Sequence, residues 1–330
     1  MHKNLKLNIN QLLMPFFESM KFLVMGAGAL GSAFGGMLAN AGHDVTLIGR
    51  ERHMIPIREH RLRISGIWGS HIVTNIRATT ELNVNCEPEI ILLTTKSFDT
   101  ETAMRSLQPL ISDDSDTVVI SLQNGIGNEE CIARYVGEAH TMGGMVITGF
   151  EFLQPGEVEV TVSAATTKIG ELTTEITPRL REIVALFNEA GIPTDAVDNI
   201  QSHIWAKALY SAALNPLSAI FRVIYGELAH QQSFAIIEKV IHEAFNVAHA
   251  EDVKLFWNRA EEYLEYLRRE QIPLTEKHHS SMLKDIERGK KTEIDFLNGV
   301  FVDLGKKHGI PTPVNETIVR MIKFLEESGR

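Results

Sequence analysis

Short apolar runs alternate with helical patterns over the first 198 residues. Residues 21–25, 44–48, 89–95 and 117–122 each form a run typical of a strand that is buried on both faces. The first two enclose a helix of small residues that ends near Gly42. Strands separated by helices predict an α/β domain with a mainly parallel sheet.

The pattern changes twice after Gly143. It first becomes rich in strands, at 146–147, 158–162 and 168–170, and then gives a helix at 178–190 and a short strand at 193–197. From residue 199 almost to the end, apolar positions recur with the period of a helix. The predicted helices are 199–220, 230–250, 257–270, 275–288, 292–308 and 313–327. We therefore predict three parts: an extension at 1–20, an α/β domain at 21–198 and an all-helical domain at 199–330.

A glycine-rich turn joins the first strand to the first helix. Residues 26–31 read GAGALG, the spacing that gives a tight bend, close approach of backbone to a pyrophosphate and close packing of helix on strand. The helix N-terminus then presents free N–H groups to the phosphates. Because a second strand follows, the motif predicts a Rossmann-type dinucleotide site. A purely structural turn is the competing interpretation.

The end of the second strand indicates which dinucleotide is bound. NAD sites usually carry an acidic residue there for the ribose 2′-hydroxyl, whereas an arginine accommodates the 2′-phosphate of NADP. This chain has Arg50, which favours NADPH, although Glu51 follows it. The alternative is that Arg50 is an ordinary surface residue.

Composition narrows the class of protein. The chain has 330 residues and a formal charge of −10, which disfavours a nucleic-acid partner. Its two cysteines, Cys86 and Cys131, fit a reducing compartment, and we expect both to be buried and unpaired. The longest apolar runs fall short of a membrane span. We therefore expect a soluble, cytoplasmic protein without a membrane partner. Histidine spacing gives no zinc motif, and no metal is expected.

Polar residues recur every four positions on the first helix of the second domain. His203, Lys207, Ser211 and Asn215 lie on one face of a helix that is otherwise apolar. A solvated face is the ordinary explanation. The neighbours are small and apolar rather than charged, however, and Pro216 interrupts the backbone where the stripe ends. A reductase needs a proton donor at the carbonyl oxygen of its substrate, and Lys207 suits that task.

Two further polar residues follow predicted strands of the sheet. Lys96 comes after the run at 89–95 and Asn124 after the run at 117–122. Ligands of open α/β sheets bind at the carboxyl ends of the strands, so both residues are expected near cofactor or substrate. Each has an ordinary alternative, a surface lysine and a turn asparagine.

Taken together, these motifs resemble those of the ketopantoate reductase family. The resemblance covers about residues 21–325. The motifs that carry it are GAGALG at 26–31, TKS at 95–97, QNG at 123–125, WAKAL at 205–209, NPLSA at 215–219, SSML at 280–283 and TEID at 292–295. It implies NADPH-dependent reduction of 2-dehydropantoate to (R)-pantoate, a step toward pantothenate and coenzyme A. It also implies an all-α C-terminal domain like that of 6-phosphogluconate dehydrogenase.

The resemblance also implies residue roles. Lys207 is the proton donor, and Glu293 contacts both the cofactor and the lysine. Glu293 has a second interpretation, as an acidic residue favoured at a helix start. The remaining implied site residues bind ligands. Those for the cofactor are Gly26, Ala27, Gly28, Ala29, Leu30, Gly31, Arg50, Lys96, Asn124, Gly149 and Glu293, and those for the substrate are Asn124, Lys207, Ser211, Asn215, Tyr225 and Ser281.

Two positions depart from the family pattern. Ser211 and Tyr225 stand where ketopantoate reductases commonly have asparagine, and both positions belong to the substrate rather than the cofactor. The departures leave the identity of the keto acid open, and with it the hypothesis of a D-2-hydroxy acid dehydrogenase of the same superfamily that acts on another 2-keto acid. A hypothesis of another class is a non-catalytic NADPH-binding redox sensor. A homodimer is a further expectation, since symmetric dimers are the commonest soluble oligomers.

Overall fold

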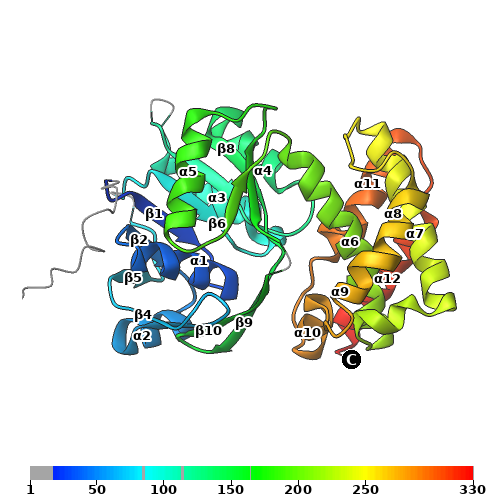
Figure 1. The fold of residues 1–330 in the computed structure, drawn as a ribbon, viewed down its shortest axis with the longest axis horizontal. Helices are drawn as coiled ribbons and strands as arrows, with labels where there is room; N and C mark the ends of the chain where they lie inside the picture. The colour runs from blue at the N-terminus through cyan, green and yellow to red at the C-terminus, as the bar shows by residue number, and fades with distance from the viewer. Residues whose placement is uncertain (1–17, 84–85, 113–114, 164, 330) are drawn as a thin grey trace, which may run out of the picture.

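The computed structural model describes residues 18–83, 86–112, 115–163 and 165–329. The extension expected at 1–20 lies almost entirely outside these residues. Figure 1 shows two parts side by side, a sheet-containing half and a helical half. In the described chain the helical half begins with α6 (Ile200–Phe221).

An eight-stranded sheet forms the centre of the first half, in the order β12-β11-β8-β7-β6-β1-β2-β5. Every neighbouring pair is parallel except β8 with β11. The predicted α/β sheet is thus confirmed. Its strands are β1 (Lys21–Met25), β2 (Asp44–Ile48), β5 (Ile76–Thr79), β6 (Ile90–Leu93), β7 (Val118–Ser121), β8 (Thr141–Met145), β11 (Thr167–Glu171) and β12 (Thr194–Ala196).

Helices cover both faces of this sheet. On one face α1 (Ala29–Asn40) and α5 (Pro178–Glu189) meet through an edge-to-face contact of Phe34 with Phe187. On the other face α3 (Thr100–Leu107) and α4 (Asn128–Val136) bury Met104 and Ile132 against the strands. The fully buried strands therefore read as continuous apolar runs, as sheets covered on both faces do.

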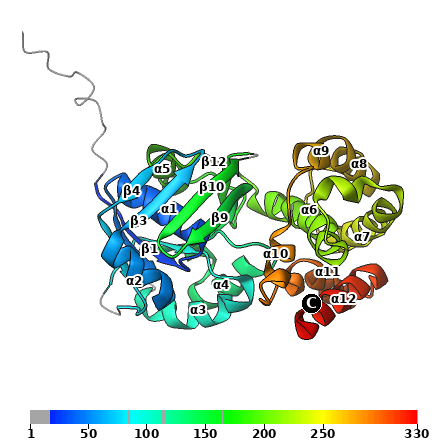
Figure 2. The ribbon, with the colours of Figure 1, turned by 90° about the horizontal axis from the view of Figure 1, so that it is seen from below.

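A second, four-stranded sheet was not predicted as a sheet, although the strand predicted at 158–162 is one of its strands, β10 (Glu157–Ser163). Its order is β4-β3-β10-β9, and α1 packs between it and the large sheet (Figure 2). A strand expected at 146–147 is wrong, because these two residues link β8 to β9. The strands of the second sheet are only partly buried and lack a continuous buried run. They are β3 (Leu62–Gly66), β4 (His71–Val73), β9 (Thr148–Gln154) and β10 (Glu157–Ser163). The helix α2 (Glu51–His60) precedes β3.

The second half is helical, as predicted, but three helices start later than expected. The chain from Thr275 to Ser280 is not helical, because its backbone bonds across to the 3-10 turn Tyr225–Ala229. Likewise, residues 292–297 form a turn before the next helix. The helix predicted at 257–270 begins at Ala260 and continues as a π turn from Leu267. The other helices are α7 (Gln231–Ala250), α8 (Ala260–Tyr266), α9 (Ile272–Leu274), α10 (Ser281–Glu287), α11 (Asn298–His308) and α12 (Pro313–Ser328).

Candidate active site

The glycine turn leaves open space at the N-terminus of α1. Gly26 has φ +119°, and a Cβ there would lie 2.6 Å from the backbone nitrogen of Thr95. A Cβ at Gly31 would lie 2.2 Å from the Gly26 carbonyl oxygen, so helix and strand pack as the motif requires. In contrast, a Cβ at Gly28 would meet nothing within 4 Å, and no side chain caps α1. The turn therefore fits a bound pyrophosphate, with Ala29 and Leu30 in the first turn of the helix.

Arg50 lies beyond the carboxyl end of β2 and directly before α2. Its side chain is exposed and forms no ion pair among the described residues. The guanidinium is thus free to meet a ligand phosphate. Glu51 begins α2, where a carboxylate is favoured by the helix dipole.

A chain of hydrogen bonds joins three residues that lie far apart in sequence. The Lys207 Nζ donates to Oδ1 of Asn124 at 2.7 Å, and the Asn124 Nδ2 donates to Oε2 of Glu293 at 3.4 Å. The other carboxylate oxygen of Glu293 accepts from the backbone nitrogen of Ser97 at 3.1 Å. Glu293 thus bonds across to the sheet half, and it does not cap a helix of its own. The structure brings Lys207, Asn124 and Glu293 together, but Glu293 is linked to the lysine through Asn124 and not by the direct contact that the resemblance implies.

Lys96 binds two carboxylates of the helical half. Its Nζ lies 2.9 Å from Oδ2 of Asp285 and 3.1 Å from Oε2 of Glu293. Burial lowers the pKa of Lys96, but Glu293 and Asp285 outweigh it and raise the pKa above its usual value. Lys96 is therefore a cation held between two acids at the junction of the halves. Asp285 was not expected here, although it lies four residues after Ser281.

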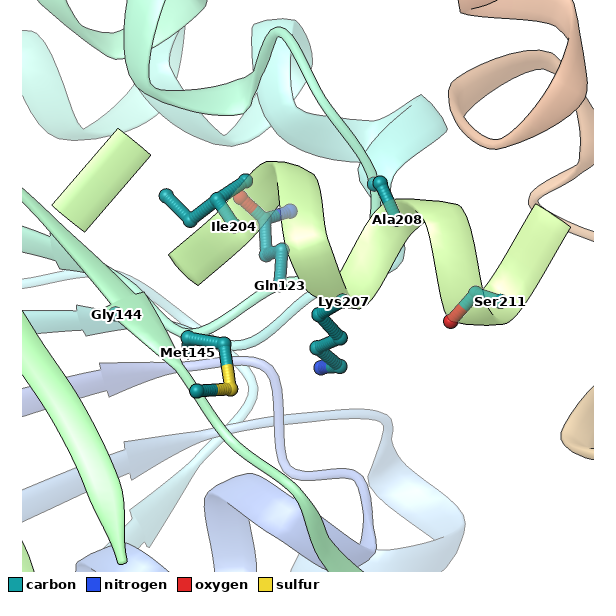
Figure 3. Close-up of a pocket in the computed structure, with 8 residues that line it drawn as sticks. Gln123, Gly144, Met145, Ile204, Lys207, Ala208 and Ser211 are labelled. Carbon is teal, nitrogen blue, oxygen red and sulfur yellow. The ribbon is translucent and has the colours of Figure 1, made fainter. Parts of the chain in front are cut away.

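Two residues of the polar stripe of α6, Lys207 and Ser211, line a small pocket together with residues of the sheet half. Figure 3 shows both side chains on one side of α6, with Gln123 and Met145 of the sheet half nearby. Ser211 is 8% exposed and Asn215 is 9% exposed, so the solvated-face interpretation is wrong for both.

The electrostatics of the pocket favour proton transfer. Burial lowers the pKa of Lys207 to about 8, and the nearby carboxylates of Glu293 and Glu129 oppose that shift. Glu129, at the start of α4, is itself buried, which raises its pKa to about 8. A lysine with a pKa close to neutral pH both gives up and regains a proton readily.

Comparison with known proteins agrees with this arrangement. Residues 22–174 match the family model described as ketopantoate reductase PanE/ApbA, and residues 199–326 match the model of its C-terminal part. The chain belongs to the ketopantoate reductase family. The 2-dehydropantoate 2-reductase of Aquifex aeolicus is 37% identical over 309 residues, which cover 93% of this chain and 97% of that protein.

Solved structures of the family superpose on nearly the whole chain. A PanE/ApbA family ketopantoate reductase from Ralstonia eutropha has a TM-score of 0.83 at 32% identity and covers 94% of this chain and 99% of its own. A D-mandelate dehydrogenase solved with NADH and anilino(oxo)acetate has a TM-score of 0.85 at 28% identity, with the same coverage. A ketopantoate reductase and a D-mandelate dehydrogenase thus share the two-part fold of this chain.

For three of the predicted ligand-binding residues, Tyr225, Ser281 and Gly149, the structure shows contacts or exposure that do not by themselves indicate a ligand. The Tyr225 hydroxyl donates to Oδ1 of Asn215, so it is already bonded inside the protein. Ser281 is exposed and makes no side-chain hydrogen bond among the described residues, whereas Ser280 caps α10. A Cβ at Gly149 would lie 2.7 Å from Oγ1 of Thr161, so packing of β9 on β10 already requires this glycine. The ligand contacts of all three stay predictions.

Sequence reasoning missed the side chains that support the loop at 123–128. The Gln123 Nε2 donates to the Thr95 carbonyl at 3.0 Å and to the Thr100 hydroxyl at 2.8 Å. The Asn128 Nδ2 donates to the Asn124 carbonyl at 2.9 Å. The only available signal was that Gln123 is the first residue of the QNG motif at 123–125. These bonds hold Asn124 where it meets Lys207.

The remaining sequence expectations concern cysteines, metals and membranes. Both cysteines are free, and Cys131 is buried, but Cys86 is only partly buried because it lies in the loop before β6. No cluster that could hold a metal ion occurs among the described residues. Among these residues, no helix is both long and apolar enough to cross a membrane.

Proposed function

We propose that this protein is an NADPH-dependent 2-dehydropantoate 2-reductase that forms (R)-pantoate on the route to pantothenate and coenzyme A. The observation that carries the proposal is the chain of bonds from Lys207 through Asn124 to Glu293. This chain of bonds places a buried proton donor, Lys207, close to a carboxylate, Glu293, at the junction of the nucleotide-binding and helical halves.

A binding protein without turnover needs neither a proton donor nor a carboxylate that helps to orient it. The arrangement therefore disfavours the redox-sensor hypothesis.

The residues present fit a nicotinamide dinucleotide phosphate. The open N-terminus of α1 at Gly28 would take the pyrophosphate, and Arg50 would take the 2′-phosphate. Lys96, Asn124 and Glu293 would meet the nicotinamide half, with Gly149 approaching by its backbone. When bound, NADPH supplies the hydride for the substrate carbonyl.

The polar residues of the pocket would perform the remaining chemistry. Lys207 donates a proton to the keto oxygen, where negative charge develops during reduction. Asn124 holds the Lys207 ammonium at 2.7 Å, and Glu293 orients Asn124 in turn. Ser211, Asn215 and Ser281 would hold the keto acid, since they follow the catalytic lysine along α6 or begin the facing helix α10.

The D-2-hydroxy acid dehydrogenase hypothesis has weaker support. The D-mandelate dehydrogenase structure is 28% identical, whereas the Aquifex aeolicus 2-dehydropantoate 2-reductase is 37% identical. We accordingly propose 2-dehydropantoate as the substrate and retain phenylglyoxylate as the competitor to test.

The deciding experiment measures oxidation of NADPH and of NADH by the purified protein with a panel of 2-keto acids. The panel contains 2-dehydropantoate, pyruvate, 2-ketoisovalerate and phenylglyoxylate. We expect the highest kcat/KM with 2-dehydropantoate and NADPH. A competitor that exceeds 2-dehydropantoate tenfold or more would overturn the substrate assignment, and equal use of NADH would overturn the assignment of Arg50.

Three finer aspects belong to the same proposal. We propose residues 21–198 and 199–330 as the two domains, with the active site between them, and a homodimer as the assembled state. A cytoplasmic location is supported by the two free thiols, Cys86 and Cys131, because reducing compartments keep thiols unpaired.

A further inference from the structure

The far end of the catalytic stripe holds a buried carboxamide with one unused donor. Asn215 lies two turns beyond Lys207 on α6 and is 9% exposed. Its Oδ1 accepts the Tyr225 hydroxyl, and its backbone carbonyl accepts the Ser280 hydroxyl at 3.3 Å. Its amide nitrogen has no hydrogen-bond partner among the described residues. It is also absent from the fully buried, unpartnered side-chain atoms, so it keeps some exposure and is free to serve a ligand or a water.

Tyr225 is held firmly in the position from which it reaches Asn215. It is 2% exposed, and its backbone nitrogen donates to the His278 carbonyl at 3.1 Å. Its ring meets the ring of His278 at 5.1 Å and, edge to face, the ring of Tyr210 at 5.8 Å. The segment Thr275–Ser280 therefore packs over Tyr225. The residue has little freedom to turn toward a substrate.

The Tyr225 hydroxyl donates to the Asn215 Oδ1, and it keeps the proton that this bond needs. Burial raises the pKa of Tyr225 well above its usual value, with a smaller contribution from Tyr210, so the hydroxyl stays protonated. A carboxamide offers one acceptor oxygen and one donor nitrogen on opposite sides. When the oxygen accepts from Tyr225, the nitrogen must face the other way.

We propose that Tyr225 is a positioning residue whose hydroxyl fixes the orientation of the Asn215 carboxamide, so that the Asn215 amide nitrogen is presented to the substrate. The proposal rests on the proposed function and makes its substrate site more specific. It differs from the sequence-based expectation that Tyr225 itself binds the keto acid. A tyrosine here substitutes for the asparagine of the family pattern by orienting a neighbour instead of contacting the ligand.

A double-mutant cycle on Tyr225 and Asn215 tests this. Tyr225→Phe removes only the hydroxyl, which frees the carboxamide to flip, and we expect KM for the keto acid to rise about tenfold, the scale of one lost hydrogen bond. kcat and the NADPH dissociation constant should stay within about twofold. Asn215→Ala should raise KM at least as much. If Tyr225 acts through Asn215, adding Tyr225→Phe to Asn215→Ala raises KM no further.

Additive effects of the two substitutions on KM would overturn the proposal, because they would mean that Tyr225 contacts the substrate by itself. An unchanged KM for Tyr225→Phe alone would overturn it as well. Asn215→Ser supplies a second cycle in case Asn215→Ala does not fold. The matched control is Tyr263→Phe, which removes the hydroxyl of a fully buried tyrosine in the same half and should leave KM unchanged.

The cycle is measured on whichever 2-keto acid gives the highest kcat/KM. A best substrate other than 2-dehydropantoate would therefore overturn the proposed function and still decide the coupling of Tyr225 with Asn215. If no acid is reduced, the same cycle is measured on the dissociation constant of 2-dehydropantoate by calorimetry. Equal dissociation constants for wild type and all variants would then overturn the proposal.

Discussion

The chemistry of the site depends on which individual side chains are buried away from solvent. Lys207 is an ordinary lysine in composition, yet burial against the sheet half lowers its pKa to about 8. Its positive form keeps one strong acceptor, the Asn124 Oδ1 at 2.7 Å. Desolvation disfavours the charged form, and the remaining carboxylates limit how far the pKa falls. The residue is thereby set close to the pH at which it must give up a proton.

The depressed pKa of Lys207 predicts the pH profile of reduction. Lys207 must carry its proton to donate it, so kcat/KM should be constant below about pH 7 and fall roughly tenfold per pH unit above about 8. The reverse oxidation should gain activity over the same range, because it requires the neutral amine. Lys207→Ala should lower kcat by about 10² and abolish this alkaline limb.

Lys207→Arg is the informative control for that profile. Arginine keeps the charge but does not lose a proton below about pH 12, so any residual activity should lack the limb near pH 8. A limb near pH 8 that persists in Lys207→Ala would assign the titration to another group, with Glu129 as the first candidate.

At the scale of elements, α6 depends on a neighbour to compensate for its proline. Pro216 has no backbone N–H, so the Ala212 carbonyl, four residues earlier, loses its helical partner. The Nδ2 of Asn298 at the start of α11 donates to that carbonyl at 3.1 Å. Asn298 is in turn 3.0 Å from Oδ1 of Asn315 on α12. A helix interrupted beside the active site is thus tied to two others.

We expect Asn298→Ala to destabilise the protein because it leaves the buried Ala212 carbonyl without a donor. The free energy of unfolding should fall by about 1–3 kcal/mol, as urea denaturation would measure. Pro216→Ala restores the backbone donor, so part of that loss should be recovered in the double variant. An equal cost of Asn298→Ala with and without Pro216 would show that the carbonyl is not the source of the effect.

At the scale of the whole molecule, charged side chains join the two halves next to the active site. Lys96 of the sheet half binds Asp285 and Glu293 of the helical half, and Lys284 of the helical half binds Glu151 at 3.3 Å. The two carboxylates that bind Lys96 are largely buried, with the Glu293 side chain 7% and the Asp285 side chain 13% exposed. In contrast, the side chains of Lys284 and Glu151 are each about 40% exposed. The two contacts should therefore differ in strength.

These two interdomain contacts give a matched pair of variants. Lys96→Ala leaves two carboxylates facing each other without a cation, and we expect the free energy of unfolding to fall by about 1–3 kcal/mol and kcat/KM to fall tenfold or more. Lys284→Ala removes an exposed pair and should cost less than about 1 kcal/mol, with little change in activity. Similar results for both variants in urea denaturation and steady-state assays would contradict the distinction.

Much of the fold could be predicted because it is encoded in contiguous residues. Continuous apolar runs mark strands covered on both faces, and GAGALG at 26–31 marks the nucleotide turn. The second sheet was not predicted as a sheet, because its strands are half-buried. In addition, β10 pairs with β3, which lies about ninety positions earlier in the chain. Pairing at such distance leaves no local periodic signal.

The sequence by itself determined the buried strands of the large sheet, the nucleotide turn and the four-residue stripe that carries Lys207, because each depends on short-range backbone preference or on the period of one element. Only the tertiary structure decided which polar and charged groups of the two halves bind each other. Glu293 reaches Ser97 across 196 positions, and Lys96 reaches Asp285 across 189. It also decided that Tyr225 binds Asn215. The physical reason is that packing two separately formed halves selects these partners, and the spacing of residues within either half does not contain them.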